Sequence, residues 1–546
     1  MSLAADLAVV GSGFGGSLVA LVARRLGRTV VLLERGAHPR FAIGESSSPL
    51  PNLLLESLAD RYGLPRLRPL SKWGTWRRAY PQVACGLKRG FSFYRHDFDR
   101  PFVADPERRN ELLVAASPRD EVADTHWYRP DFDHFLVREA EEAGAVYLDR
   151  TVLDRVEVSE DRAVLEGERA GTSVRVEARL LVDASGPRGF LWRSLRLPER
   201  KFPYLPRTCG LFTHFAGVRR LDEMGISTES AIAPYPPDDA ALHHVFDGGW
   251  IWVLRFANGI TSAGVAAAET LARKAGLSDG APGWDRLLER LPTVRDQFAA
   301  AKAMLPFVYR PLLPFRAAVA SGPGWTLLPS AAAFVDPLLS TGFPLTLLGV
   351  ERLGRALEED WGSRRLPARL EADGRKTLSE ADTAALLIAA LYASFSDFPL
   401  FVALSKLYFA AASFSEAARR LSRPELSGSF LCGDRTPFGQ ELRRACRKAI
   451  ALGGRGAAEP GARDHLLSDI ERAIEPLDVA GLTRPGRRNW YPVLAEDLLE
   501  SAGKLGATRV EIERLLERTG FFAPPAGTEP DPTSRPSASP PLSRRT

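Results

Sequence analysis

A run of glycines follows the first strand-like segment of the chain. After the apolar residues 7–10, Gly11, Gly13 and Gly16 stand in the pattern GxGxxG. In such a turn the first glycine makes a tight bend, the second lets the backbone approach a pyrophosphate, and the third allows close helix packing. The N-terminus of the following helix then faces the phosphates. This spacing predicts a dinucleotide site.

An acid stands where the same site needs one. Glu34 directly follows a second strand-like segment, 29–33. A carboxylate at that position can accept hydrogen bonds from both hydroxyls of an adenosine ribose. The predicted contacts with the dinucleotide are Gly11, Gly13, Phe14, Gly15, Gly16, Glu34 and Arg35.

A second loop has a composition suited to binding an anion. Ser340, Thr341 and Gly342 stand directly before a helical pattern. A loop of small residues that leads into a helix presents backbone N–H groups, which can bind an anion such as a halide. These three residues are therefore candidate anion contacts.

A mixed α/β fold must position these segments. Strand-like segments near 152–182 and 251–265 follow the glycine turn, and long helical patterns begin at about 346. This order predicts an α/β fold, with a Rossmann-like dinucleotide-binding domain, an inserted mixed β-sheet and a helical C-terminal part. The predicted parts are a domain at 1–365 with its inserted sheet at about 75–125 and 195–310, and a helical region at 366–522.

Two segments near the C-terminus have unusual compositions. Residues 523–546 are rich in proline and serine, and we expect a disordered tail because they cannot bury enough apolar surface to fold. The apolar stretch 383–414 is interrupted by Asp397 and Lys406, before an uncharged run reaches the roughly 18 residues that a membrane span needs. We expect buried or cavity-lining helices there, and no membrane span.

The composition excludes several classes of protein. The chain has 546 residues, a formal net charge of +5, 45% hydrophobic and 25% charged residues, which is typical of a folded globular protein. Its basic residues are scattered, without the runs that bind nucleic acid. Its four cysteines are far apart and lack the spacing of a metal site or a disulfide framework. The first residues lack the pattern of a secretory signal, so we expect a cytoplasmic protein.

Two further segments resemble flavoproteins. Residues 180–186, a strand that ends in a small-residue turn, are similar to the second nucleotide-contacting strand of glutathione-reductase-type flavoproteins. This likeness implies cofactor contacts from Asp183 and Gly186. Residues 129–136 resemble the helix before the inner strand of flavin monooxygenases, which implies a contact from Arg129. The implied fold is of the glutathione-reductase type, and the implied cofactor is FAD.

The sequence resembles one family in particular, the flavin-dependent halogenases. Ile-Gly-Glu-Ser-Ser-Ser-Pro at 43–49 is similar to a flavin-contacting segment of that family, and Asp-Pro-Leu-Leu-Ser-Thr-Gly at 336–342 is close to its halide loop. Leu339 replaces a glutamate of tryptophan-type members, which argues against free tryptophan as substrate. The resemblance implies flavin contacts from Gly44, Glu45, Ser46, Ser47, Asp336, Pro337, Gly342 and Phe343. It implies chloride or bromide contacts from Ser340, Thr341 and Gly342.

A lysine motif carries the resemblance further. Residues 87–93 resemble the Lys-x-Gly-x-x-Phe segment of phenol- and pyrrole-type halogenases. The resemblance implies that Lys88 is the catalytic lysine, which holds hypohalous acid by hydrogen bonding or as a haloamine. Burial of such a lysine would lower its pKa. Lys72 lies nearer the usual interval from Gly44 and is the alternative.

Alternating tryptophans form the last motif. Residues 249–255 resemble the halogenase signature Trp-x-Trp-x-Ile-Pro, although Leu254 and Arg255 replace its last two residues. The resemblance implies that Trp250 and Trp252 keep the substrate away from the flavin. Alternating indoles on a strand are also common in protein cores.

The resemblance implies a complete reaction. Reduced FAD and oxygen give a C4a-hydroperoxide, halide attacks it to form hypohalous acid, and Lys88 delivers the halogen to an electron-rich carbon, as of a phenol or pyrrole. No second nucleotide fingerprint is evident in the sequence, so a separate NAD(P)H-dependent flavin reductase is expected as partner. The aromatic substrate is either free or tethered to a carrier protein.

Two other activities fit the same fold. The incomplete tryptophan motif favours an FAD-dependent monooxygenase that hydroxylates or epoxidises its substrate. A flavoenzyme like the geranylgeranyl reductases would give the apolar stretch 383–414 a lipid-binding role. The sequence leaves both open as alternatives.

Overall fold

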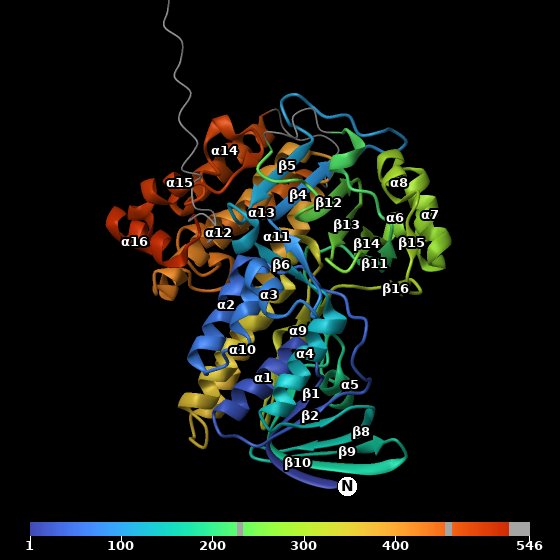
Figure 1. Ribbon diagram of the computed structural model, residues 1–546, viewed down its shortest axis with the longest axis vertical. Coiled ribbons are helices and arrows are strands. Elements are labelled where there is room, and N and C mark those ends of the chain that lie inside the picture. The colour runs from blue at the N-terminus through green and yellow to red at the C-terminus, as the bar shows by residue number, and fades with distance from the viewer. Residues whose placement is uncertain (227–232, 454–460, 523–546) are drawn as a thin grey trace, which may run out of the picture.

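The computed structural model describes residues 1–226, 233–453 and 461–522. The predicted disordered tail, 523–546, therefore lies outside the described residues. The chain forms two large β-sheets and a layer of C-terminal helices, with the first sheet in the lower part of Figure 1 and the second in the upper part.

The first sheet is the Rossmann-like one. Its main strands run in the order β18-β19-β10-β1-β2-β7, and β8 and β9 extend it beside β10. The four pairs from β19 to β7 are parallel. Residues 7–10 and 30–33 are buried along their whole length, as expected for parallel strands covered on both faces. The strands are β1 (Ser2–Val10), β2 (Val30–Leu33), β7 (Val146–Leu148), β8 (Thr151–Val158), β9 (Ala163–Arg169), β10 (Thr172–Asp183), β18 (Ser321–Gly322) and β19 (Trp325–Leu327).

Three helices bring the predicted flavin segments together. Helix α1 (Phe14–Arg25) packs on both α4 (Arg129–Glu142) and α10 (Gly342–Glu359). Each of these helices begins at a residue predicted to contact the cofactor, namely Phe14, Arg129 and Gly342. Their N-terminal ends therefore come from three distant parts of the sequence.

The second sheet is larger and mixed. Its strands run in the order β15-β11-β14-β13-β12-β4-β5-β21, and β16 also pairs with β11. The last of these, β21, comes from the C-terminal part of the chain and pairs parallel to β5. The strands are β4 (Gly90–Arg95), β5 (Glu111–Ala115), β11 (Thr208–Ala216), β12 (Ala241–Phe246), β13 (Gly249–Arg255), β14 (Ile260–Ala268), β15 (Lys302–Ala303), β16 (Val308–Arg310) and β21 (Trp490–Tyr491). Two short pairs form separate two-stranded sheets, β3 (Cys85–Lys88) with β6 (Asp124–Trp127) and β17 (Phe315–Arg316) with β20 (Ala333–Phe334).

Long helices make up most of the C-terminal part. Helix α12 is the one described helix long and apolar enough to cross a membrane, but 78% of its apolar window is buried inside the protein. It packs on α2 and α14, so it is a core helix. The helices here are α11 (Leu366–Ala393), α12 (Phe398–Arg420), α13 (Phe438–Gly453), α14 (Ala462–Ile474), α15 (Ala495–Glu500) and α16 (Arg509–Thr519). Those not yet given are α2 (Pro49–Arg61), α3 (Trp73–Ala79), α5 (Phe190–Ser194), α6 (Glu269–Ala275), α7 (Ala281–Glu289), α8 (Pro292–Phe298) and α9 (Pro329–Ala332).

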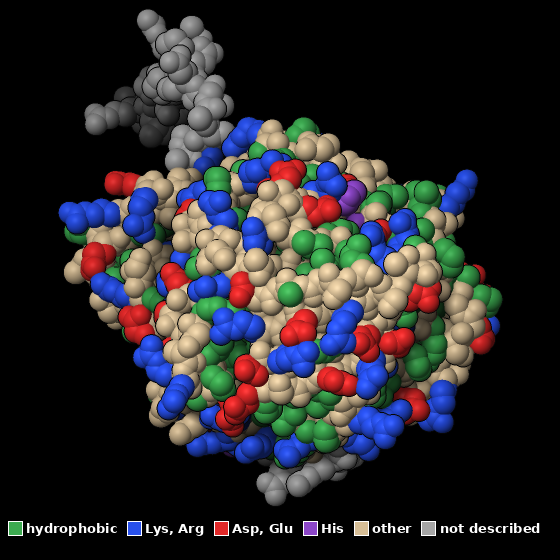
Figure 2. Space-filling view, turned by 90° about the horizontal axis from the view of Figure 1, so that it is seen from below, with side chains coloured by type: hydrophobic (Ala, Val, Ile, Leu, Met, Phe, Trp, Pro, Cys, Tyr) green, Lys and Arg blue, Asp and Glu red, His purple; other side chains and the backbone are tan. Residues whose placement is uncertain are grey.

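The predicted fold class is confirmed, since a Rossmann-like sheet, a second mixed sheet and C-terminal helices are all present. The predicted boundaries at 365 and 522 stay a prediction. One cluster of buried apolar side chains runs without a break from Leu18 through Val350 to Leu404. On the face shown in Figure 2, basic and acidic side chains are interspersed.

Candidate active site

The glycine turn has the geometry that the sequence predicts. Gly11 has a φ of +101°, and a Cβ on Gly16 would lie 1.9 Å from the Gly11 carbonyl oxygen. Gly13 directly precedes α1, and a Cβ there would meet the Arg129 guanidinium at 3.4 Å. The turn therefore requires glycine both for its backbone conformation and for the close approach of α1.

Glu34 is fixed at the mouth of this turn. Its carboxylate accepts hydrogen bonds from Ser12 N (3.1 Å), Ser12 Oγ (3.0 Å) and Gly36 N (2.9 Å). Burial by itself would raise the pKa of Glu34, but Arg40 and these hydrogen bonds bring it below its ordinary value. Glu34 is thus an anion beside the turn, as a ribose contact requires, whereas Arg35 is exposed at the surface.

Arg129 joins two of the predicted flavin segments. Its guanidinium forms a bidentate ion pair with Asp133 (both distances 2.7 Å) and donates to the carbonyls of Ile43 (3.2 Å) and Gly44 (2.9 Å). It also lies 4.9 Å from the centre of the Phe14 ring. Asp133 was not predicted as a site residue, although its position one helical turn after Arg129 could have indicated the pair.

Aromatic rings line the place where the segments meet. The Phe343 ring packs against Phe14 (4.9 Å between centroids) and Trp127 (4.4 Å). Gly44 has a φ of +86°, and a Cβ there would lie 3.8 Å from Phe343 Cε1. The structure therefore brings 43–49 and 334–343 to the glycine turn.

The predicted halide loop leads into the N-terminus of α10, where there is open space beside the backbone. Leu339 (φ +59°) and Ser340 (φ +55°) both adopt the left-handed region, and Thr341 is buried. Gly342 is the first residue of the 18-residue helix α10, and a Cβ on it would meet no atom within 4 Å. Unpaired backbone N–H groups and open space at a helix N-terminus suit a small anion.

Two predicted carboxylates are engaged by the protein instead. Asp183 accepts from Ser185 N (2.8 Å) and Leu191 N (2.7 Å). Asp336 accepts from Leu338 N (3.0 Å) and Tyr392 Oη (3.0 Å), and burial raises its pKa to about 6. Both carboxylates shape their loops. The two carboxylate side chains are thus used within the protein. We therefore expect the predicted cofactor contacts of Asp183, Gly186, Asp336 and Pro337 to come from backbone atoms.

Lys88 contacts the predicted flavin segment 43–49. Its side chain is 0% exposed, and Nζ donates to Ser46 Oγ (2.9 Å) and to the Ser47 carbonyl. Nζ also lies 3.8 Å from the centre of the Phe91 ring. Burial lowers the pKa of Lys88, and the nearby Asp124 opposes this shift.

The alternative lysine has different surroundings. Lys72 Nζ lies 4.0 Å from Glu56, and its side chain is 20% exposed. Burial lowers the pKa of Lys72, while Glu56 raises it. The geometry joins Lys88, and not Lys72, to the segment that carries Ser46 and Ser47.

The sequence did not predict a buried pair of an acid and a histidine. His214 Nε2 lies 2.9 Å from Glu45 Oε1, and both side chains are no more than 2% exposed. Glu45, predicted as a flavin contact, is thus held by a residue of β11, far away in the sequence. No local pattern marks His214, because the pair forms only when the second sheet meets the flavin segment.

The tryptophan pair lies in the core. Trp250 and Trp252 stand two residues apart on β13 with their ring centroids 5.6 Å apart, and both are buried. Arg255, one departure from the halogenase signature, donates to Asp238 Oδ1 at 2.7 Å. This ion pair explains the arginine as a structural residue of the second sheet.

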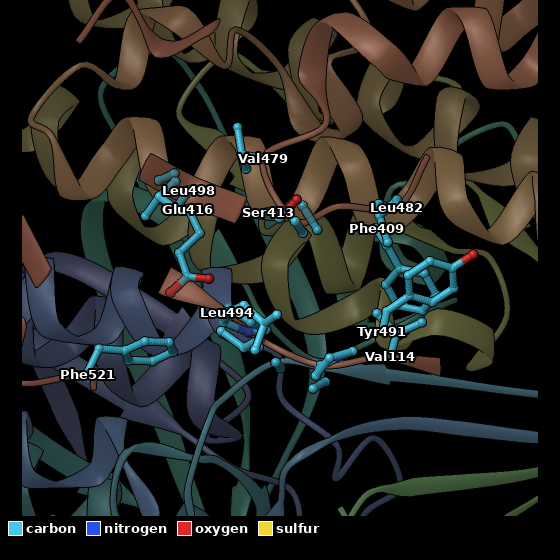
Figure 3. Close-up of a pocket in the computed structure, with 18 of the residues that line it drawn as sticks. Val114, Phe409, Ser413, Glu416, Val479, Leu482, Tyr491, Leu494, Leu498 and Phe521 are labelled. Atoms are coloured by element: carbon cyan, nitrogen blue, oxygen red, sulfur yellow. The ribbon is translucent and has the colours of Figure 1, made fainter. Parts of the chain in front are cut away.

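A cavity lies on the other side of Phe91. It has a volume of about 150 Å³, and it is bounded by β4 and β5, by α12 and by the C-terminal segments around β21 and α16. Figure 3 shows the Glu416 carboxylate directed into this space among Leu494, Leu498 and Phe521. Other lining residues are Ser48, Phe91, Val114, Tyr408, Phe409 and Tyr491.

Known proteins resemble this chain over most of its length. The Tryptophan halogenase family model matches residues 125–394. Monodechloroaminopyrrolnitrin halogenase PrnC of Pseudomonas fluorescens is 27% identical over 505 residues, which are 86% of each chain. Tetracycline 7-halogenase of Kitasatospora aureofaciens is 27% identical over 418 residues, or 74% of this chain and 73% of that protein.

Solved structures agree with these matches. Halogenase PltM, solved in complex with phloroglucinol and FAD, superposes with a TM-score of 0.78 at 23% identity, over 89% of this chain and 99% of PltM. The flavin-dependent brominase Bmp2 gives a TM-score of 0.54 at 19% identity, over 86% of this chain and 98% of Bmp2. The chain belongs to the flavin-dependent halogenases, enzymes that act with FAD and a halide.

Proposed function

We propose that the protein transfers chloride or bromide to an electron-rich aromatic compound bound in the cavity beside Lys88. One observation carries the proposal. Lys88 is fully buried, it is held by Ser46 and Ser47 of the flavin segment, and it contacts Phe91, which lines the cavity. A lysine in this position connects the flavin side of the protein to an apolar chamber.

The residues present fit FAD. A Cβ on Gly11 or Gly16 would clash with the protein's own backbone, so the turn can hold the N-terminus of α1 close to a pyrophosphate. Glu34, beside the turn, would accept hydrogen bonds from the ribose. Arg129 and Gly44 would flank the phosphates or the ring. When bound, FAD would supply the oxidation of halide by oxygen to hypohalous acid.

The chain's own residues have separate tasks in this proposal. The backbone N–H groups at Thr341 and Gly342 hold the halide at the N-terminus of α10. Lys88 holds the hypohalous acid and presents its halogen to the arene. Trp250 and Trp252, which are buried on β13, keep the substrate from reaching the flavin.

The cavity indicates the class of substrate. Its wall is mostly apolar and aromatic, from Phe91, Tyr408, Phe409 and Tyr491, with Glu416 as a polar group. Such a wall suits a flat, small aromatic molecule with one hydrogen-bond donor. Leu339 replaces the glutamate of tryptophan-type members, so free tryptophan is not the expected substrate.

We infer that the substrate is a free molecule. Among the relatives, 1H-pyrrole-2-carbonyl-[peptidyl-carrier protein] chlorinase of Pseudomonas fluorescens matches 63% of this chain, whereas PrnC matches 86%. The relative that matches more of this chain is named for a small molecule, and not for a carrier protein. A separate NAD(P)H-dependent flavin reductase and a cytoplasmic location complete the proposal.

The two alternative activities have little support from the residues that suggested them. The monooxygenase was suggested by the incomplete tryptophan motif, in which Arg255 replaces a proline. The ion pair of Arg255 with Asp238 gives this arginine a structural role, so the replacement does not favour a monooxygenase. A lipid-binding role for 383–414 has no support from α12, whose apolar window is mostly buried in the protein core.

The test is an assay of the purified protein with FAD, NADH, a flavin reductase and bromide. A panel of free phenols, indoles and pyrroles, and pyrrole tethered to a carrier protein, is offered, and products are read by mass spectrometry. We expect the isotope doublet of bromine in a free phenol or pyrrole, and its loss in Lys88→Ala while hydrogen peroxide is still released. A product that gains one oxygen atom with or without bromide would contradict the proposal.

A further inference from the structure

Lys88 has a buried acid directly opposite it. Strands β3 and β6 pair antiparallel, and Lys88 stands across from Asp124, so their side chains lie on the same face. Lys88 is 0% and Asp124 7% exposed. Asn52 Nδ2 donates to Asp124 Oδ1 at 2.8 Å, and Ser47 Oγ donates to Asn52 Oδ1 at 3.1 Å. This chain of hydrogen bonds fixes the carboxyl group on the same face of the strand pair as the lysine.

One oxygen of that carboxyl group has no partner. Asp124 Oδ2 is buried and accepts no hydrogen bond from any residue that the structure describes. An unpartnered carboxylate oxygen in the protein interior is costly, whereas a protonated carboxyl group has less charge to solvate. Burial accordingly raises the pKa of Asp124, and Lys88 opposes the shift. The two groups together are therefore suited to share one proton.

The other titratable groups around the pair are less suited to give a proton. His126 on β6 and His243 on β12 face Lys88, and burial lowers the pKa of both far enough to keep them neutral. Glu416 on α12 faces Asp124 but is paired with Arg420 at 2.8 Å. Among the described residues that face Lys88, Asp124 is the group that can hold a proton near neutral pH.

We propose, resting on the proposed function, that Asp124 is the catalytic acid for the transfer of halogen from hypohalous acid to Lys88. Nζ is hydrogen-bonded to Ser46 Oγ and the Ser47 carbonyl, and no ion pair joins it to Asp124 among the described residues, so the Lys88 side chain first turns toward Oδ2. A proton then moves from the Lys88 ammonium to Oδ2, which breaks an N–H bond and forms an O–H bond. The amine lone pair then attacks the halogen, so that an N–halogen bond forms and the halogen–oxygen bond breaks. The departing hydroxide takes the proton of Asp124 and leaves as water, and the carboxylate takes one proton from the halogenated nitrogen.

The pair solves a problem that a lone lysine has. An ammonium group has no lone pair with which to attack the halogen, and a free amine has no acid for the departing hydroxide. With one proton shared, the nucleophile and the acid are present at the same time. General acid catalysis of this kind contributes about 10²–10⁴-fold to a rate.

The first experiment uses the full chain without flavin or arene. The protein is given stoichiometric hypochlorite at pH 7 for a short fixed time and then desalted, and the retained oxidising equivalents are measured with iodide. The signal of Lys88→Met is subtracted to leave the haloamine at Lys88. We expect Asp124→Asn to lower this difference about 100-fold and Asp124→Glu to restore most of it.

A matched control distinguishes an acid from any nearby negative charge. Asp120 is 44% exposed and pairs with Arg89, next to Lys88 in sequence, at 2.7 Å. Asp120→Asn should form the haloamine as the parent protein does. Melting temperatures and FAD binding of all variants are compared, and Asp124→Asn should retain both because it keeps the shape and the acceptor for Asn52.

Two outcomes would overturn the inference. Haloamine formation at Lys88 in Asp124→Asn at the parent rate would show that Asp124 gives no proton. Equal losses in Asp124→Asn and Asp120→Asn would assign the effect to charge alone. An Asp124-dependent haloamine in a protein that halogenates no arene would support the inference and contradict the proposed function, so the two failures are distinguishable.

Discussion

The flavin side and the substrate side of this protein are built in different ways. The flavin side depends on backbone geometry, because Gly11, Gly16 and Gly44 occupy places where a Cβ would clash or where φ is positive. The substrate side is a cavity whose walls come from β4, β5, α12 and the C-terminal segments. The glycine turn has no room for a Cβ at Gly11 or Gly16, whereas the substrate side is open space lined by side chains. Lys88 stands between them.

Removal of the connecting residue should have the largest effect. Lys88→Ala should lower halogenation at least about 10³-fold, while FAD binding and the release of hydrogen peroxide continue. Product is measured by mass spectrometry and peroxide by a coupled dye. Lys72→Ala is the control and should keep most of the activity. The reverse result would make Lys72 the catalytic lysine.

The glycine turn should be nearly as sensitive. Gly16→Ala places a Cβ 1.9 Å from the Gly11 carbonyl oxygen, and the resulting shift of α1 should weaken FAD binding about 100-fold. Gly503→Ala is a suitable control, since a Cβ there would meet no atom within 4 Å. Binding is measured by the quenching of flavin fluorescence. Unchanged affinity in Gly16→Ala would contradict the assignment of the turn.

Substitution of a residue that lines the cavity should have a smaller effect, and it should change KM and not FAD affinity. Ala412 lines the cavity, and Ala412→Trp should raise KM for the aromatic substrate about 10-fold, with FAD affinity unchanged. Ala372→Trp, at an exposed position of α11, should leave KM as it is. A change of FAD affinity in Ala412→Trp would mean that the two sides are not independent.

The smallest predicted effect is a pH dependence of folding stability that arises from a buried histidine in the second sheet. His244 is fully buried between His96 (2.9 Å) and Gln297 (2.9 Å), and burial lowers its pKa to about 4. The unfolded chain binds a proton near pH 6.5 while the folded chain does not, so stability is lost as the pH falls from 6.5 toward 4. The loss should be about 1 kcal/mol per pH unit. Thermal melting from pH 7.5 to 5 measures it, and His244→Gln should flatten the slope.

Residues that act through local patterns could be predicted from the sequence. The glycine turn and Glu34 each depend on neighbours within a few residues, so spacing alone indicated them. The helix that begins at Arg129 was indicated by its resemblance to a helix of flavin monooxygenases. The α/β fold followed from the order of strand-like and helical patterns. Lys88 was favoured because Gly90 and a phenylalanine flank it as in the family motif, and the structure places it beside Ser46 and Ser47.

Residues that meet only in the folded chain could not be predicted. Asn52 and Asp124 touch because α2 and β6 come together, and His214 reaches Glu45 from another sheet. A sequence pattern contains no register between such distant segments. The carboxyl groups of Asp183 and Asp336 show the converse, because their internal hydrogen bonds are visible only in the structure.

The pairing of β21 with β5 has a consequence for engineering. Trp490 and Tyr491 cover the outer edge of β5, and Tyr491 also lines the cavity. An open strand edge recruits other chains, so a chain cut before Trp490 would be prone to aggregate. A graft of C-terminal segments from a relative, made to change which arene is accepted, must therefore carry its own edge strand matched to β5.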